Sequence, residues 1–299
     1  MELISVIPRG YCQGVVRAIQ TAVNTVKEYP DTPVTMLGMI VHNAFVVEEC
    51  RKLGIRFVED PARTRLELLD EIDEGVVIFT AHGVCDAVKQ KAKDKGLIVV
   101  DATCKDVEKT HEAVRNHPGD VVYIGKKNHP EAEGTTGLKD NIWLVSSLSD
   151  IDSLPDLHDV LITCQTTLSL HDLAEIVARL KEKYPDARLL DEICNATRIR
   201  QEAVMHLKDT DVLIVVGDRR SNNSRQLAAI AQKAGIPEAW LIDSAMDLRE
   251  EMLKGKNRIA VTSGSSTPND LTRQVIAVIQ NYIDTGILSL PDHISCGLL

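Results

Sequence analysis

Residues 97–114 read LIVVDATCKDVEKTHEAV, and this stretch contains the pattern from which the fold is predicted. A short apolar run rich in β-branched residues predicts a buried strand, and the apolar spacing after Cys104 predicts a helix. The same order of strand, cysteine and helix surrounds Cys12 and Cys194. The three cysteines lie about 90 residues apart, and similarity at a fixed period indicates an internal repeat.

Two further signals recur in register with the cysteines. One is a strand ending in glycine with a polar residue four positions later, at residues 38 and 42, 125 and 129, and 217 and 221. The other is a strand ending in threonine before a polar turn, at residues 80–83, 163–166 and 262–265. Three signals in one order favour three related units. Because functional groups gather at the carboxyl ends of parallel strands, all of these positions are candidate site residues.

Short apolar runs alternate with helical patterns along the whole chain, which is typical of parallel sheets covered by helices on both faces. We predict the α/β class, with three pseudo-threefold-related lobes of mostly parallel sheets around a central metal-cluster site. The lobes are expected at residues 1–103, including the N-terminal strand, 104–193 and 194–299. The expected strands are residues 3–7, 34–37, 76–79, 97–100, 121–124, 142–145, 160–162, 189–190, 212–216, 240–242 and 259–261. Helices are expected from Asn43 to before Gly54 and from Val84 to Lys95.

The composition is that of a globular protein and excludes several classes. The 299 residues are 44% hydrophobic and 26% charged, and the formal net charge is −10. This acidic balance argues against nucleic-acid binding, and no apolar run approaches the ~20 residues of a membrane span. The N-terminal residues do not have the pattern of a signal peptide. Seven cysteines, an odd number, do not suggest a disulfide framework, so we expect a cytoplasmic protein without a nucleic-acid or membrane partner.

The three repeated cysteines predict a metal centre, because convergent thiolates would repel one another without a cation. Zinc, held by three cysteines and another ligand, is one candidate. An iron–sulfur cluster is the other; with only three cysteines, one iron would remain open to a substrate oxygen. The absence of a CxxC motif counts against a zinc ribbon or finger. The spacing of Cys12, Cys104 and Cys194 leaves both metals open.

The polar turns of the repeats contain neutral hydrogen-bond donors and few acids, which suits an anionic ligand such as a phosphate or diphosphate. Their candidate residues are His42, His82, His129, Thr166, Ser221, Asn222, Asn223 and Ser266. Taken alone, the Ser and Asn turns are equally typical of helix N-caps. Their place in the repeat is what favours a binding role.

Glu131 follows His129 by two residues and could deliver a proton to a bound oxygen. An acid in the first turn of a helix also complements the helix dipole, and Glu133 competes for either role. The spacing does not decide between these readings. No Walker A or GxGxxG motif is present, so no nucleotide cofactor is expected and any electrons should come from an external carrier.

A series of short motifs, in order along nearly the whole chain, together resembles the 4-hydroxy-3-methylbut-2-enyl diphosphate reductase family of the non-mevalonate isoprenoid route. These motifs are GYCQGVVRA around Cys12, VHN at His42, AHG at His82, DATC at Cys104, HPEAEGT at His129, QTTLS at Thr166, DEICNATRIRQEAV around Cys194, SNNS at Ser221 and GSSTP at Ser266. No single motif carries the resemblance. Cys164 before QTT and Asn222 in SNNS depart from the usual pattern of the family.

The resemblance implies a [4Fe–4S] cluster held by Cys12, Cys104 and Cys194, with one open iron for the substrate hydroxyl. It implies that Glu131 supplies protons and that Thr166 hydrogen-bonds near that hydroxyl. The diphosphate would be held by His42, His82, His129, Ser221, Asn222, Asn223 and Ser266. The implied reaction is reductive dehydroxylation of (E)-4-hydroxy-3-methylbut-2-enyl diphosphate to isopentenyl and dimethylallyl diphosphate, with electrons from a ferredoxin- or flavodoxin-type donor.

Two other function classes compete with this reading. One is a zinc hydrolase or lyase that acts on a phosphorylated metabolite, which would contain zinc in place of iron and sulfide. The other is an iron–sulfur sensor or scaffold without catalysis, in which Glu131→Gln would change nothing because no proton is delivered.

Overall fold

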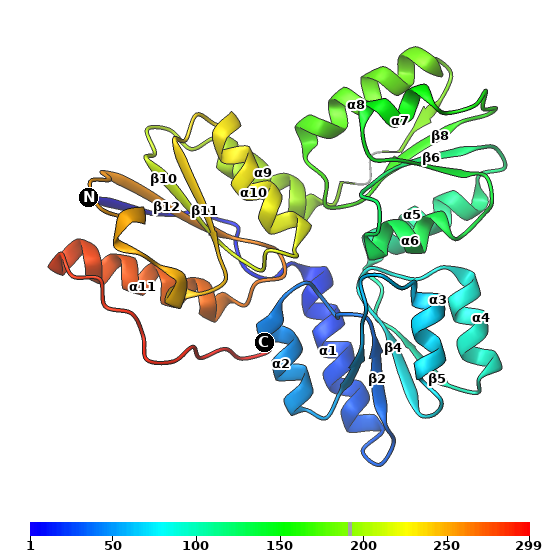
Figure 1. The fold of residues 1–299 in the computed structure, drawn as a ribbon, viewed down its shortest axis with the longest axis horizontal. Coiled ribbons are helices and arrows are strands. Elements are labelled where there is room, and N and C mark those ends of the chain that lie inside the picture. The colour runs from blue at the N-terminus through cyan, green and yellow to red at the C-terminus, as the bar shows by residue number, and fades with distance from the viewer. Residues whose placement is uncertain (191–192) are drawn as a thin grey trace. The chain divides into compact units, whose positions relative to one another are not determined.

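The computed structural model describes residues 1–190 and 193–299, and it confirms an α/β fold with three parallel sheets (Figure 1). Each sheet has four strands, and every strand pairing in the described part of the chain is parallel. Asp191 and Glu192, which belong to the DEIC motif, lie outside the described residues.

The first sheet has the order β3-β2-β4-β5 and lies within the first predicted lobe. Its strands are β2 (Val34–Leu37), β3 (Arg56–Val58), β4 (Val76–Phe79) and β5 (Ile98–Asp101). The helical elements of this part of the chain are α1 (Gln13–Glu28), α2 (Ala44–Lys52), α3 (Arg65–Leu68), η1 (Leu69–Glu71) and α4 (Asp86–Asp94). Sequence analysis did not predict β3, because its three residues form no apolar run.

The second sheet has the order β7-β6-β8-β9 and carries helices on both faces. Its strands are β6 (Val121–Ile124), β7 (Ile142–Val145), β8 (Leu161–Cys164) and β9 (Arg188–Leu189). Its helices are α5 (Lys105–Asn116), α6 (Pro130–Thr136), α7 (Leu148–Asp152) and α8 (Leu170–Lys183). Ile162 packs with residues of α7 and α8, whereas its neighbour Leu161 packs with Val114 of α5. This alternation is expected of a strand that is buried on both faces.

The third sheet has the order β1-β12-β10-β11 and combines the beginning of the chain with its last lobe. Its strands are β1 (Glu2–Ser5), β10 (Val212–Val216), β11 (Glu238–Ile242) and β12 (Arg258–Ser263). Its helical elements are α9 (Asn195–Met205), α10 (Asn222–Lys233), η2 (Ala245–Asp247), η3 (Glu250–Met252) and α11 (Asn269–Thr285). Ile214 of β10 packs in one core with α11, and Leu213 packs in another with α9 and α10.

The place of β1 corrects the expected first lobe, to which we had assigned the N-terminal strand. Glu2 to Ser5 instead pair in parallel with Arg258 to Val261 of β12. The strand order explains this. In the first two sheets the strand that comes first along the chain lies between the second and the third, and the fourth lies at the edge beside the third. The third sheet has the same order if β1 is counted as its fourth strand. β1, β5 and β9 are therefore equivalent edge strands, and each precedes one repeated cysteine. The lobe boundaries at 103/104 and 193/194 stay predictions.

Packing divides the chain into two compact units, which we describe separately. One comprises residues 1–15, 42–49 and 195–299, and contains the third sheet. The other comprises residues 16–41 and 50–194, and contains the first and second sheets.

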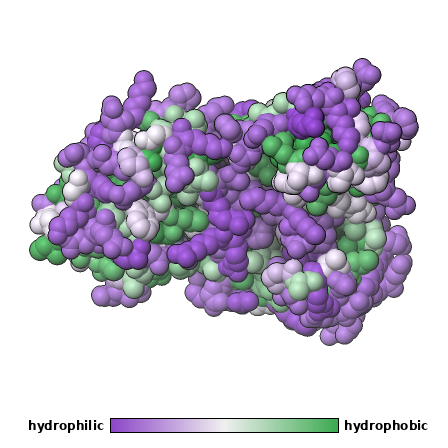
Figure 2. All heavy atoms as spheres, turned by 45° about the horizontal axis from the view of Figure 1, so that its top comes forward, coloured by the Kyte–Doolittle hydropathy of each residue, from purple (hydrophilic) through white to green (hydrophobic). Residues whose placement is uncertain are grey.

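The surface agrees with the charged composition. The face drawn in Figure 2 is mainly hydrophilic, with smaller groups of hydrophobic residues between. Within residues 1–190 and 193–299, no helix is both long and apolar enough to cross a membrane.

Candidate functional site

The three repeated cysteines occupy equivalent positions, which supports the predicted repeat. Each directly precedes a helix: Cys12 precedes α1, Cys104 is the N-cap of α5, and Cys194 precedes α9. Each also donates its backbone N–H to the threonine-ended turn of its own sheet. The acceptors are Ser265 O for Cys12 at 3.0 Å, Ala81 O for Cys104 at 3.0 Å, and Thr166 O for Cys194 at 3.2 Å.

These cysteines suit an anionic metal centre by their chemistry. All three thiols are partly exposed, and each stands at the start of a helix, where the helix dipole stabilises a bound anionic group. Cys50 and Cys164, which are outside the repeat, are buried. The donor set of three sulfurs therefore fits the expected cluster, and the assignment of its ligands stays a prediction.

Glu131 and Glu133, the two candidate acids, have different hydrogen-bond partners in the structure. The carboxyl group of Glu131 is buried in the first turn of α6 and accepts hydrogen bonds from Thr166 N at 2.7 Å and Thr166 Oγ1 at 3.1 Å. Burial raises the pKa of Glu131 from 4.5 to about 7, although the bonds from Thr166 oppose this shift. Glu133 instead accepts a bond from Arg65 N, the first residue of α3. Only Glu131 is thus paired with another candidate site residue.

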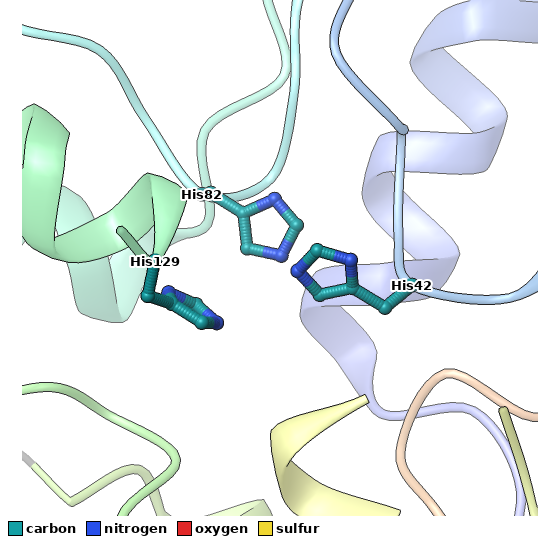
Figure 3. Close-up of side chains that lie close together, drawn as sticks. All are labelled: His42, His82 and His129. Atoms are coloured by element: carbon teal, nitrogen blue, oxygen red, sulfur yellow. The ribbon is translucent and has the colours of Figure 1, made fainter. Parts of the chain in front are cut away.

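His129 and His82 lie side by side at the carboxyl ends of β6 and β4 (Figure 3). Their ring centroids are 5.5 Å apart and the rings are nearly perpendicular, at 88°. His129 is the N-cap of α6, and its Nδ1 accepts a bond from Glu131 N at 3.2 Å. In the neutral ring the proton is then on Nε2. His42, also labelled in Figure 3, belongs to the other unit and is described with it.

In the unit with the third sheet, the SNNS segment begins α10. Ser221 is the N-cap and accepts a bond from Ser224 N at 3.3 Å. Asn222 and Asn223 are buried in the first turn, and Asn223 Oδ1 accepts from Ser265 N at 3.0 Å. Ser265 therefore links Asn223 to Cys12, whose N–H it accepts.

Ser266 connects two of the candidate binding segments within this unit. Its Oγ donates to His42 O at 3.2 Å and lies 3.5 Å from Ser221 Oγ. His42 immediately precedes Asn43, whose Oδ1 accepts from Val46 N at 3.2 Å and so caps α2. The structure thus brings the backbone of His42 and the side chains of Ser221 and Ser266 together, and their binding role stays a prediction.

Several supporting residues were missed by sequence analysis. Gly10 N donates to Ser263 Oγ at 2.7 Å, and Gly10 O accepts from Arg200 Nη2 at 2.8 Å. A Cβ at Gly10 would lie 1.8 Å from Asn269 Oδ1, so only glycine fits. These contacts fix the loop that carries Cys12. Their one sequence signal is the glycine two residues before the cysteine.

Three parallel-sheet lobes and a buried carboxyl group, whose pKa is raised to about 7 by burial, are features of an α/β enzyme. Residues 3–280 match the family model described as LytB protein. The chain is 45% identical to a 4-hydroxy-3-methylbut-2-enyl diphosphate reductase of Macrococcus caseolyticus, over 98% of this chain and 93% of that protein. A protein of the same name from Symbiobacterium thermophilum is 46% identical, over 94% of this chain and 98% of that protein.

Solved structures agree with these relatives. The E-1-hydroxy-2-methyl-but-2-enyl-4-diphosphate reductase from Plasmodium falciparum superposes with a TM-score of 0.85 at 34% identity, over 92% of this chain and 86% of that one. A second structure, of (E)-4-hydroxy-3-methyl-but-2-enyl diphosphate reductase, gives 0.66 at 34% identity, over 94% of this chain and 100% of that one. The chain belongs to the LytB protein family, and the relatives described above are named as reductases. The resemblance inferred from the motifs is confirmed.

Proposed function

We propose that this protein reduces (E)-4-hydroxy-3-methylbut-2-enyl diphosphate to isopentenyl and dimethylallyl diphosphate. The allylic C–O bond breaks, two electrons and two protons are consumed, and water leaves. The observation that carries the proposal is the buried carboxyl group of Glu131, whose pKa of about 7 keeps a proton available near neutral pH. A departing hydroxyl group needs such a donor.

The cofactor we propose is a [4Fe–4S] cluster with Cys12, Cys104 and Cys194 as its ligands. When bound, it would supply the electrons and one open Lewis-acidic iron. The chain itself contributes three backbone-anchored cysteines at helix starts. The electrons would come from an external donor of the ferredoxin or flavodoxin type, because the sequence has no nucleotide-binding motif.

The diphosphate would be bound by donors from the strand-end turns. His129 and His82, whose rings lie beside each other, would be two of these binding residues. In the other unit, the donors would come from the segments of His42, Ser221 and Ser266, with Asn222 and Asn223 at the same helix start. Hydrogen bonds to a charged diphosphate are stronger than neutral ones, so several such donors can fix the allyl group for reaction.

Anaerobic reconstitution with iron and sulfide tests the cofactor and the reaction together. We expect about four irons and four sulfides per chain, and turnover of the allylic diphosphate with a low-potential reductant. Stoichiometric zinc without iron would overturn the cluster, and an intact cluster without turnover would support a sensor or scaffold instead.

Serine variants of the ligands refine this test. Replacing Cys12, Cys104 or Cys194 should lower the iron content and abolish turnover, because serine is a poor ligand for these clusters. Cys296→Ser is the matched control, since Cys296 lies outside the repeat and packs against the core of α11. Equal iron loss in the control would contradict the proposed ligand set.

A further inference from the structure

Asp218 is a nearly buried acid that no motif of the sequence analysis includes. It follows Gly217 at the carboxyl end of β10 and is 8% exposed. Its Oδ2 accepts a hydrogen bond from Ala44 N at 3.0 Å. Ala44 is the first residue of α2, so its N–H is one of those that a helix leaves without an internal partner. A carboxylate at this position also complements the helix dipole.

Arg220 holds the same carboxylate from the other side. Asp218 Oδ1 accepts from Arg220 N at 2.8 Å and from Arg220 Nε at 3.0 Å, and Oδ2 accepts from Arg220 Nη2 at 2.7 Å. Burial would raise the pKa of Asp218, but the hydrogen bonds from Arg220 outweigh it and keep the pKa below its ordinary value. The group is therefore a fixed anion at neutral pH. The backbone O of Asp218 also accepts a hydrogen bond from Ser221 N at 2.9 Å.

The carboxylate thus joins two segments that are far apart in sequence. On one side it holds the start of α2, two residues after His42. On the other side it organises the turn that ends at Ser221. Ser266 Oγ makes a second link, to His42 O at 3.2 Å. One link therefore ends on His42 itself and the other on Ala44, and all of these residues belong to the same compact unit.

We propose that Asp218 is a positioning residue that holds the His42 turn on the Ser221 turn and so places His42 for diphosphate binding. This inference rests on the proposed function. Asp218 does not touch the ligand; it fixes the backbone from which His42 projects. A binding group held in place before the ligand arrives loses less conformational freedom on binding, which increases affinity.

The test is a double-mutant cycle measured by calorimetric binding of inorganic diphosphate to the folded protein. Asp218→Asn keeps the shape but removes the charge, and we expect about tenfold weaker binding because charge-assisted bonds to Ala44 and Arg220 are lost. In a His42→Ala background the same change should weaken binding by less than about twofold, since the residue it positions is gone. A purely structural role would weaken binding equally in both backgrounds and would overturn the proposal.

Two further variants keep the result interpretable. Asp211→Asn removes an acid of the same lobe that accepts N–H bonds from Asn257 and Arg258, just before β10 rather than after it, and should leave diphosphate affinity unchanged. If Asp218→Asn does not fold, Ala44→Pro removes the N–H donor at a helix position that tolerates proline, and the same tenfold loss is expected.

The outcomes separate this inference from the proposed function. If His42→Ala itself leaves diphosphate affinity unchanged, the binding role of His42 fails. If His42→Ala weakens binding and neither Asp218→Asn nor Ala44→Pro does, only the role of Asp218 fails.

Discussion

The chemistry of Glu131 depends on its surroundings more than on its residue type. A glutamate in water is ionised at neutral pH, whereas burial brings the pKa of Glu131 to about 7. The two bonds from Thr166 keep the shift from being larger and hold the carboxyl group in one orientation. The result is an acid that can both release and regain a proton under cellular conditions.

Turnover should therefore fall as pH rises above about 7, because the protonated form of Glu131 disappears. Glu131→Gln cannot donate a proton and should lower turnover by about 10²- to 10⁴-fold while the iron content stays unchanged. The measurement is a pH–rate profile of both proteins with the same reductant. A variant with full activity would remove Glu131 from the mechanism.

The pH dependence of the free energy of unfolding is an independent test of the raised pKa of Glu131. Since the folded pKa of Glu131 lies above the ordinary 4.5, the folded state holds this proton more tightly, and its contribution is lost as pH rises toward 7. Glutamine stays neutral and has no such pH dependence. The free energy of unfolding of Glu131→Gln minus that of the parent should therefore be larger at pH 8 than at pH 4. Denaturant unfolding at the two pH values checks this sign.

At the scale of elements, α6 begins after its N-cap His129 and contains Glu131 and Gly134. Gly134 allows the helix to approach the turn of Gly83 closely. Gly134 is buried in this helix, and a Cβ there would lie 3.1 Å from Gly83 O. From the other side, a Cβ at Gly83 would meet His111 Cε1 at 2.9 Å. The turn that contains His82 is thus enclosed between α5 and α6.

Gly134→Ala tests this close approach. In an ordinary helix interior the change would stabilise by about 1 kcal/mol. Here we expect no stabilisation and several-fold weaker binding of inorganic diphosphate, because the added methyl group displaces the His82 turn. Thr136→Ala, in the same helix, is the control and should bind diphosphate as the parent does. A more stable Gly134→Ala protein with unchanged affinity would show that the approach is unimportant.

The elements were predicted well because burial on both faces makes these strands apolar throughout. Val76–Phe79 and Val212–Val216 have the expected bounds for this reason. β3 was missed because its three residues, Arg56–Val58, are too few to form a recognisable apolar pattern. The contribution of Asp218 could not be predicted, since it depends on an N–H from a helix distant in sequence.

At the scale of the whole molecule, the repeat predicted three sheets, but not which lobe receives the first strand. Hydrophobic pattern identifies a strand and does not identify its partner, so β1 was assigned to the nearest lobe in sequence. The repeated order of strands resolves this, because in the described part of the chain the third sheet alone takes its fourth strand from outside its own segment.

Leu3→Asp tests this placement, since Leu3 packs against the core that contains α11. A charge there should cost about 2 kcal/mol or more and should increase hydrogen exchange in β12, but not in β2 or β4. Ser5→Asp places the same charge at an exposed position of β1 and should have little effect. Increased exchange in β2 and β4 instead would contradict the assignment.

The pairing of β1 with β12 also imposes an order on biosynthesis. Residues 2–5 leave the ribosome long before residues 258–263 are translated, so β1 has no partner while most of the chain is being made. The Cys12 amide likewise waits for Ser265, which is translated later still. A nascent or truncated polypeptide therefore presents two of the proposed sulfur ligands, Cys104 and Cys194, anchored to the first and second sheets, and the third on an unanchored segment. With the proposed ligand set, the complete group of three sulfurs would be available only after translation has passed the last strand.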